Sequence, residues 1–249
     1  MSALIGSTGF VGGHLQKRYE FTQTYNRANI SEIQGLETDL LICAGLPAEK
    51  WRANRNAESD LLNMSELAEA LTTVQAKKAV LISTIDVYQP AVNVDENDWP
   101  DLKGVDAYGR NRAWFEIFFR LRFPDSVVLR LPGLFAPDLR KNLIFDLMTG
   151  KKENLQSVHR DSRFQFFNMA EIWKVTEICL NSNIPILNVA SEPISAQEIA
   201  SLFGEVLGTS APKVNYDMRS IYDKQYNGGD GYLYSSEKII SEIRTLVVN

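Results

Sequence analysis

Residues 3–12 read Ala3-Leu4-Ile5-Gly6-Ser7-Thr8-Gly9-Phe10-Val11-Gly12, an apolar run that leads directly into three spaced glycines. In a turn from a strand to a helix, the first such glycine permits the tight turn and the second lets a pyrophosphate approach the backbone. The third lets the helix pack on the strand. The N-terminus of the helix then faces the anion. The segment therefore predicts a dinucleotide-binding turn, and the alternative is a turn with a purely structural role.

Apolar segments continue to alternate with helical patterns after this turn. We expect strands at residues 21–25, 39–44 and 79–85, and helices at residues 10–19 and 61–73. Strands that are separated by helices predict parallel βαβ units. Lys77 and Lys78 are expected to close the second helix, because cations suit the C-terminal end of a helix dipole.

The second half of the chain starts with an excursion and then returns to the same alternation. Residues 88–107 are acidic and contain Pro90 and Pro100, which indicates a segment that leaves the sheet. We expect helices at 108–122, 168–181, 195–207 and 237–243, and strands at 126–131 and 185–190. Ser195 and Glu198 have the spacing of a capping box.

These patterns predict an α/β fold, a Rossmann-like doubly wound parallel sheet with a small C-terminal substrate lobe. We expect one compact domain over residues 1–249. Its Rossmann core covers about residues 1–132 plus 168–190, and its substrate lobe about residues 133–167 and 191–249.

Composition and charge restrict the classes of function. With 26 Lys and Arg against 31 Asp and Glu, the net charge is −5, which argues against a nucleic-acid partner. No apolar run approaches the roughly 18 residues of a membrane span, and no signal peptide fits before the first strand. We therefore expect a cytoplasmic protein. Cys43 and Cys179 are expected to be reduced core thiols, and His14 and His159 are too separated for a metal site.

Beyond the glycine turn, segments over nearly the whole chain resemble the extended short-chain dehydrogenase/reductase family, the NAD-dependent epimerases and dehydratases that act mainly on nucleotide sugars. The segments that carry the resemblance are Gly6–Gly12, Leu62-Asn63 through Ala70, Ser83-Thr84-Ile85-Asp86-Val87-Tyr88, Tyr108-Gly109-Arg110-Asn111-Arg112, Leu129-Arg130-Leu131-Pro132 and Leu187-Asn188-Val189-Ala190.

The resemblance implies a catalytic set of Ser or Thr, Tyr and Lys. Thr84 and Tyr108 fall at the first two positions, so Tyr108 would exchange a proton with a substrate oxygen that Thr84 orients. Since a free tyrosine has a pKa of about 10, a nearby cation must favour its phenolate form. The alternative is that Tyr108 is an ordinary residue of an amphipathic helix.

Arg112 stands where the family has its lysine. It lies one helical turn beyond Tyr108, on the same face, so we expect it to supply positive charge and to hold the nicotinamide ribose. A guanidinium is never neutral, so it cannot relay protons as a lysine can.

Asp86 comes at the carboxyl end of an expected central strand, where open α/β sheets bind their ligands. In the dehydratase branch of the family a Glu often stands here, which implies an acid/base role for Asp86. The alternative is that Asp86 only caps the following turn.

The cofactor is expected to be NADP(H) rather than NAD(H). Residues 24–27 lack an acidic side chain for a ribose 2′-hydroxyl, and Arg27 suits a 2′-phosphate. Alternatively Arg27 is only solvated, or Glu32 reaches the ribose. The expected cofactor contacts are Gly6, Ser7, Thr8, Gly9, Phe10, Val11, Gly12, Asn26, Arg27, Cys43, Ala44, Gly45, Asn63, Ser83, Tyr108, Arg112, Leu131 and Pro132.

A basic stretch follows the strand at 126–131, where the family places the diphosphate of its substrate. The expected substrate contacts are Asp86, Val87, Arg140, Lys141, Asn142 and Arg163. The alternative is that these charges are only solvated.

Together the motifs predict an NADP(H)-dependent oxidoreductase or epimerase of a nucleotide-activated sugar. The alternative is a non-catalytic NADP(H)-binding sensor or scaffold protein, which the replacement of the lysine by Arg112 favours. The aromatic helical stretch at 114–119 is a candidate face for a homodimer.

Overall fold

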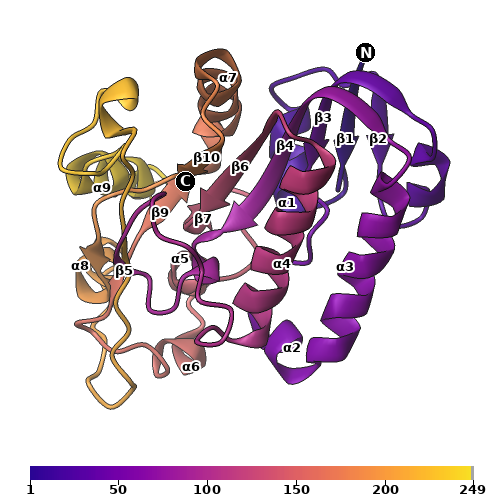
Figure 1. Cartoon of the computed structure of the whole chain (residues 1–249). Helices are drawn as coiled ribbons and strands as arrows, with labels where there is room; N and C mark the ends of the chain where they lie inside the picture. The colour runs from indigo at the N-terminus through magenta and orange to yellow at the C-terminus, as the bar shows by residue number, and fades with distance from the viewer. Residues whose placement is uncertain (248–249) are drawn as a thin grey trace. The chain divides into compact units, whose positions relative to one another are not determined.

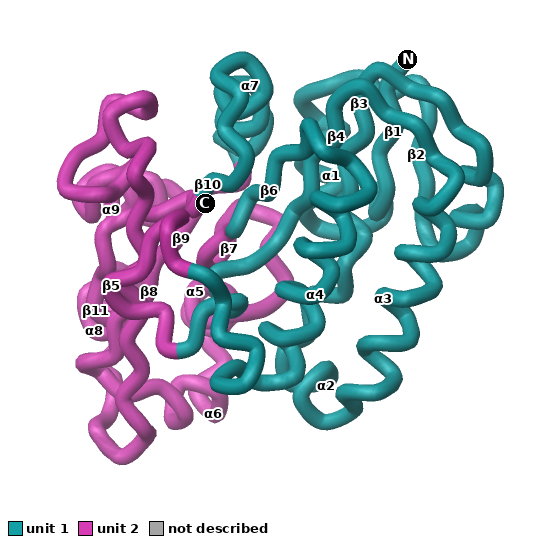
Figure 2. Tube along the Cα trace, in the orientation of Figure 1, with its two compact units in different colours: residues 1–89, 99–130, 170–187 teal, residues 90–98, 131–169, 188–249 magenta. Residues whose placement is uncertain are grey.

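The computed structural model describes residues 1–247, which fall into two compact units (Figure 2). Unit 1 contains Met1–Gln89, Trp99–Arg130 and Ala170–Leu187. Unit 2 contains Pro90–Asp98, Leu131–Met169 and the residues from Asn188 onward. Within residues 1–247, no helix has both the length and the apolar character needed to cross a membrane.

Six parallel strands form the central sheet, which confirms the predicted Rossmann-like fold. Its spatial order is β10-β6-β4-β3-β1-β2. The strands are β1 (Ser2–Ile5), β2 (Gln23–Tyr25), β3 (Glu37–Cys43), β4 (Gln75–Thr84), β6 (Ser126–Leu131) and β10 (Ile186–Asn188).

The strand order reverses at β1, which lies between β2 and β3. Ile5 at the end of β1 is in register with Tyr25 of β2 and with Cys43 of β3. The carboxyl ends of three strands therefore meet at one edge of the sheet. In open α/β sheets this reversal is where ligands bind.

The helices of unit 1 are α1 (Phe10–Gln16), α2 (Lys50–Arg55), α3 (Ala57–Leu71), α4 (Ala107–Arg122) and α7 (Ile172–Ser182), and short 3-10 turns are η1 (Ile30–Ile33) and η2 (Ile85–Val87). Figure 1 shows α3 and α4 side by side, and these two helices are packed against each other. Their apolar faces bury Met64, Leu71, Phe115 and Phe119 against the sheet, where Cys43 also lies. Cys43 and Cys179 are both buried free thiols, and burial raises the pKa of Cys43 to about 12.

The prediction that Lys77 and Lys78 close a helix is wrong. The helix α3 ends at Leu71, and both lysines lie on β4, which begins at Gln75. Parallel pairing with β3 extends β4 toward the N-terminus of the chain, so that Lys78 is in register with Leu40 of β3. The alternating exposure at the start of the strand explains why its polar residues resemble a helix end in the sequence.

Unit 2 consists of short elements. Its two-stranded sheets pair β5 (Val92–Val94) with β12 (Asp217–Met218), β7 (Gly133–Phe135) with β9 (Phe166–Asn168), and β8 (Arg163–Phe164) with β11 (Ile194–Ser195). Its helices are α5 (Leu143–Met148), α6 (Lys152–Leu155), α8 (Ala196–Leu202) and α9 (Ser236–Arg244), together with the 3-10 turn η4 (Asp223–Tyr226). The predicted capping box of Ser195 and Glu198 is confirmed at the start of α8.

A buried ion pair fixes α4 to the sheet. Glu116 on α4 accepts a hydrogen bond of 2.7 Å from Arg130 on β6 and one of 2.5 Å from the Ser83 hydroxyl on β4. Arg130 also donates to the hydroxyl of Tyr88. Because both charged side chains are buried, this pair sets how α4 lies on the strands.

Replacing Arg130 by Met is expected to lower the free energy of unfolding by about 3–5 kcal/mol, because the buried Glu116 carboxylate loses its counter-charge. Urea unfolding followed by circular dichroism measures this change. Lys77→Met is the matched control, since it removes an exposed ion pair with Asp39. Equal destabilisation of the two variants would contradict the assigned importance of the buried pair.

Candidate active site

The glycine turn is shaped by close backbone contacts. Gly6 has a φ of +85°, and a Cβ atom on it would lie 2.3 Å from the carbonyl oxygen of Ala44. A Cβ atom on Gly12 would lie 2.1 Å from the carbonyl oxygen of Gly6. The protein's own packing therefore explains why these two positions hold glycine. It also brings the turn beside Ala44 and Gly45, two of the expected cofactor contacts.

Gly9 differs from the other two glycines. A Cβ atom there would meet only the Gly6 carbonyl oxygen, at 3.2 Å, and Gly9 is exposed with a φ of −78°. Gly9 precedes α1 directly, and the first N–H groups of a helix have no acceptor within that helix. The space above Gly9 therefore fits an anionic group such as a pyrophosphate.

Arg27, which follows β2, forms a hydrogen bond with a side chain of α3. Arg27 is exposed, and its Nη2 donates a hydrogen bond of 2.7 Å to Oδ1 of Asn63 on α3. Asn26 lies in the preceding turn, where its backbone N–H donates to Asn29. Glu32 lies on η1, and its charge adds to the effect of burial in raising the pKa of Tyr25. Arg27 and Asn63, two of the expected cofactor contacts, are thus neighbours.

Tyr108 and Thr84 meet at the carboxyl end of β4. Thr84 lies close enough to Tyr108 to lower the pKa of its phenol, and the Thr84 hydroxyl accepts a hydrogen bond of 3.2 Å from the N–H of Asp86. The first turn of α4 approaches η2 closely, because a Cβ atom on Gly109 would lie 2.0 Å from the Asp86 carbonyl oxygen. The glycine after Tyr108 therefore permits the contact between Tyr108 and Thr84.

Arg112 lies against the Tyr108 ring, and both of its terminal nitrogens are hydrogen-bonded. Its Cζ is 3.8 Å from the ring centroid, and the guanidinium contacts both carboxylate oxygens of Asp60 on α3, at 2.5 and 2.9 Å. It also donates to the carbonyl oxygens of Tyr108 and Pro47. Its Nε is buried and has no hydrogen-bond partner within residues 1–247. The charge expected beside Tyr108 is present, whereas a contact of Arg112 with a ribose stays a prediction.

Lys50 is a residue of this cluster that sequence reasoning missed. Its Nζ lies 2.6 Å from Oδ1 of Asp86 and 3.6 Å from Oδ2 of Asp106. Asp106 caps α4 by accepting a hydrogen bond from the N–H of Gly109. A lysine in the connection after β3 belongs to no motif, so only the tertiary structure reveals its place.

The charges around Tyr108 shift its pKa in opposite directions. Burial is the largest influence and raises its pKa above the ordinary value of about 10, and the charge of Asp86 raises it further. Arg112, Thr84 and Lys50 lower the pKa. Tyr108 therefore carries its proton at neutral pH and is able to donate it.

Other predicted contacts of unit 1 have buried side chains. Ser83 directs its hydroxyl to Glu116, and Val87 is fully buried. A contact of Ser83 with a cofactor would therefore involve its backbone.

In unit 2, the side chain of Asn142 caps the N-terminus of α5. Its Oδ1 accepts from the N–H groups of Ile144 and Phe145 at the start of α5, and its Nδ2 donates to the carbonyl oxygen of Leu134. Arg163 donates a hydrogen bond of 2.6 Å to the carbonyl oxygen of Pro193. Arg140 and Lys141 are exposed, and Leu131 and Pro132 are buried. The roles of these residues toward a substrate or cofactor stay predictions.

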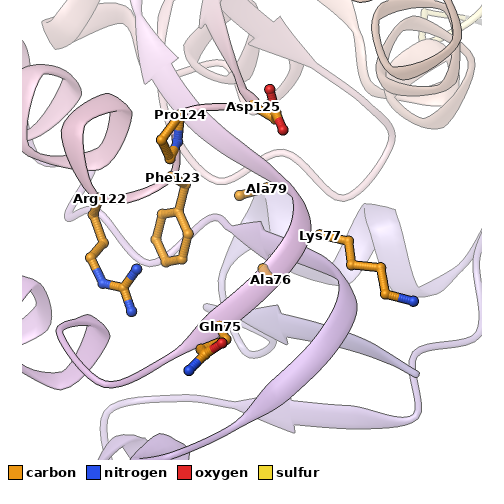
Figure 3. Close-up of a pocket in the computed structure, with 8 residues that line it drawn as sticks. All are labelled: Gln75, Ala76, Lys77, Ala79, Arg122, Phe123, Pro124 and Asp125. Carbon is orange, nitrogen blue, oxygen red and sulfur yellow. The ribbon is translucent and has the colours of Figure 1, made fainter.

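A pocket of about 290 Å³ lies elsewhere (Figure 3). Gln75, Ala76 and Lys77 line it from the start of β4, Arg122 lines it from the end of α4, and Asp125 from the connection between α4 and β6. These are amino ends of parallel strands, opposite the carboxyl ends that carry Thr84. We therefore place the candidate site at the cluster around Tyr108 and not in this pocket.

Comparison with known proteins shows the fold at low sequence identity. A dTDP-4-dehydrorhamnose reductase from Clostridium acetobutylicum has a TM-score of 0.74 at 15% identity, with 100% of both chains covered. A dTDP-4-dehydrorhamnose reductase from Bacillus anthracis, in complex with NADP, has a TM-score of 0.75 at 16% identity, covering 97% of this chain and 96% of that one.

An epimerase has the same fold. UDP-glucuronic acid 4-epimerase from Bacillus cereus, in complex with a fluorinated UDP-sugar and NAD, has a TM-score of 0.68 at 14% identity, covering 100% of this chain and 98% of that one. No family model and no curated protein matches the sequence. The chain therefore has the fold of nucleotide-sugar reductases and epimerases.

Replacing Arg112 by Met is expected to lower the free energy of unfolding by about 3–5 kcal/mol, because Asp60 stays buried without its counter-charge. Arg112→Lys keeps the charge but loses the two-pronged contact, so it is expected to fall between the wild type and Arg112→Met. Chemical unfolding of both variants measures these losses. In the double variant Asp60→Asn/Arg112→Met, the loss should be smaller than the sum of the single losses. Additive losses would show that the two side chains are not coupled.

Proposed function

We propose that this protein is an NAD(P)H-dependent oxidoreductase or epimerase of a nucleotide-activated sugar, and that NADP(H) is its cofactor. The observation that carries the proposal is the meeting of Tyr108, at the start of α4, with Thr84, at the carboxyl end of β4. It lies in the same unit as the glycine turn. The solved structures of similar fold support it, since they include an NADP complex of a reductase and an NAD complex of an epimerase.

In this proposal the glycine turn holds the pyrophosphate over Gly9 and the first N–H groups of α1. Arg27, oriented by Asn63, receives the 2′-phosphate, and residues 24–27 offer no carboxylate that would favour NAD(H) instead. Arginine suits this task because its planar donors match phosphate oxygens. When bound, the nicotinamide ring supplies or accepts the hydride.

The chain's own residues handle the proton. Tyr108 donates its proton to the substrate oxygen during reduction and takes it back in the reverse direction, while Thr84 orients the same oxygen. Burial of Tyr108 keeps bulk water from competing for this proton. Asp86, next to Thr84, is the proposed second acid/base group.

Arg140, Lys141 and Arg163 are the proposed contacts for the substrate diphosphate, because a diphosphate needs several cationic donors. Asn142 is left out, since its side chain caps α5. We also propose a homodimer through α4. Of the predicted face at 114–119, Phe115 and Phe119 are buried in the core, so the proposed contact is made by the exposed Trp114 and Ile117. Such an apolar surface is typical of a protein interface.

A non-catalytic NADP(H)-binding sensor or scaffold is the second candidate. One observation favours it: the guanidinium of Arg112 is engaged with Asp60, so α4 offers no side chain that can gain and lose a proton where the family has its lysine. If the protein turns over any nucleotide sugar with NADPH, it is an enzyme. If it binds NADPH but turns over none of a broad panel of nucleotide sugars, the result supports the sensor.

Gly9→Ala is expected to weaken NADPH binding by at least about tenfold while leaving the fold intact, because its Cβ occupies the space of the pyrophosphate. Gly12→Ala is the matched comparison and is expected to destabilise the fold by about 1–3 kcal/mol or more through overpacking. Fluorescence titration with NADPH and urea unfolding measure the two effects. Wild-type affinity in a folded Gly9→Ala variant would place the cofactor elsewhere.

Tyr108→Phe is expected to abolish turnover and to leave NADPH affinity nearly unchanged, because the hydroxyl contributes to chemistry more than to binding. In the wild type, reduction needs protonated Tyr108, and burial raises its pKa. The rate should therefore persist through neutral pH and fall only as the pH passes that raised pKa. NADPH consumption followed across pH measures both effects, with Tyr19→Phe as the control. Full activity of Tyr108→Phe would refute the proposed chemistry.

A further inference from the structure

We propose that Asn54 on α2 is a positioning residue for Tyr108, which fixes the backbone at the start of α4 and thereby the place of the Tyr108 hydroxyl. The juxtaposition that carries the proposal is one amide side chain that is bonded at both ends. Its Oδ1 accepts a hydrogen bond of 2.9 Å from the N–H of Tyr108, and its Nδ2 donates one of 2.9 Å to Oδ2 of Asp106. The importance of these contacts for turnover rests on the proposed function.

The start of α4 requires hydrogen-bond acceptors from outside the helix. The first N–H groups of a helix have no partner within it, and an N-cap side chain satisfies the one at the second or the third position. Asp106 is the N-cap of α4, and its Oδ1 accepts a hydrogen bond of 3.0 Å from the N–H of Gly109, at the third position. The cap therefore does not serve the N–H of Tyr108, at the second position, for which Asn54 provides the acceptor.

An amide side chain suits this place because it carries an acceptor and a donor on one short stem. Asn54→Asp keeps an acceptor for the N–H of Tyr108 but loses the donor, and it faces Asp106 with a second carboxylate. Asn54→Leu has a similar size and makes neither bond. The exchanged pair Asn54→Asp/Asp106→Asn restores both bonds with donor and acceptor reversed, and asparagine caps a helix about as well as aspartate.

The backbone of Tyr108 is also held at its carbonyl group. Nη1 of Arg112 donates a hydrogen bond of 3.1 Å to this oxygen, and the Cζ of Arg112 lies 3.8 Å from the ring centroid. Arg112 is fixed in turn by its buried ion pair with Asp60 on α3. The N–H of Tyr108 thus depends on α2, whereas its carbonyl oxygen and its ring depend on Arg112. Because the hydroxyl lies at the far end of a rigid ring, a small rotation of the backbone displaces it from Thr84.

The helix α2 has little apolar packing of its own. It is six residues long, and Ala53 is its one buried residue. Its contacts with the candidate site are polar, and they include both bonds of Asn54 and the ion pair of Lys50 with Asp86. An element with few buried apolar contacts opens easily unless other contacts hold it. Asn54 therefore contributes directly to how α2 and the first turn of α4 lie on each other.

The first part of the test is turnover of a nucleotide sugar with NADPH. We expect Asn54→Leu to lower kcat about ten- to hundredfold and to leave KM for NADPH within about twofold, because a displaced phenol impairs chemistry more than binding. Asn54→Asp should lower kcat as well, and Asn54→Asp/Asp106→Asn should restore most of it. Asn56→Leu is the matched control and should change nothing, because the Asn56 side chain is exposed and caps no N–H group.

The second part observes the ring itself and needs no turnover. The full chain carries 3-fluorotyrosine at position 108, and its fluorine NMR signal is recorded for each variant. A ring held in one place gives a narrow signal whose shift differs from that of free fluorotyrosine. We expect Asn54→Leu to move this signal toward the free value, and the exchanged pair to return it to the wild-type position. A protein that turns over no nucleotide sugar still gives this signal, so failure of the proposed function is distinguishable from failure of this inference.

Three results would overturn the proposal. One is a folded Asn54→Leu variant that is less stable to urea but has an unchanged fluorine signal or an unchanged kcat, since its role would then be structural alone. Another is an equal effect of Asn56→Leu. The third is an exchanged pair that performs no better than Asn54→Asp. If Asn54→Leu does not fold, Asn54→Ser provides the same comparison.

Discussion

The ion pair between Arg112 and Asp60 is the constraint on which the geometry of the candidate site depends. It joins α4 to α3 through two contacts in the buried interior, and it places the guanidinium 3.8 Å beneath the ring of Tyr108. The ring is consequently held between this charge and the end of β4. A tyrosine that exchanges a proton with a substrate must keep one orientation, and a buried two-pronged pair provides such rigidity.

The two cations near Tyr108 have different environments. Arg112 provides support from within the core, and Lys50, from a different helix, provides a partly exposed charge next to Asp86. The positions of the three glycines show a similar division, since Gly6 and Gly12 are required by packing, whereas the space at Gly9 suits a ligand.

Local patterns predicted much of the fold. The strand at 126–131 has the predicted bounds, and the helix that carries Tyr108 begins one residue before the predicted start, at Ala107. Lys77 and Lys78 were placed on a helix because the polar start of β4 has no apolar signal, and only its pairing with β3 determines its conformation. The pairing of Tyr108 with Thr84 followed from a motif, whereas Lys50 and Asp60 could not be predicted. Their partners are distant in sequence, so tertiary packing alone brings them together.

The central claim is that unit 1 binds a nicotinamide dinucleotide with its reactive ring at Tyr108. A crystal structure of the wild-type protein grown in saturating NADPH tests this claim most directly. We expect density for the pyrophosphate over Gly9 and for the nicotinamide ring beside Tyr108 and Thr84. Density for the dinucleotide at another surface, or a bound dinucleotide whose nicotinamide ring lies away from Tyr108, would contradict it.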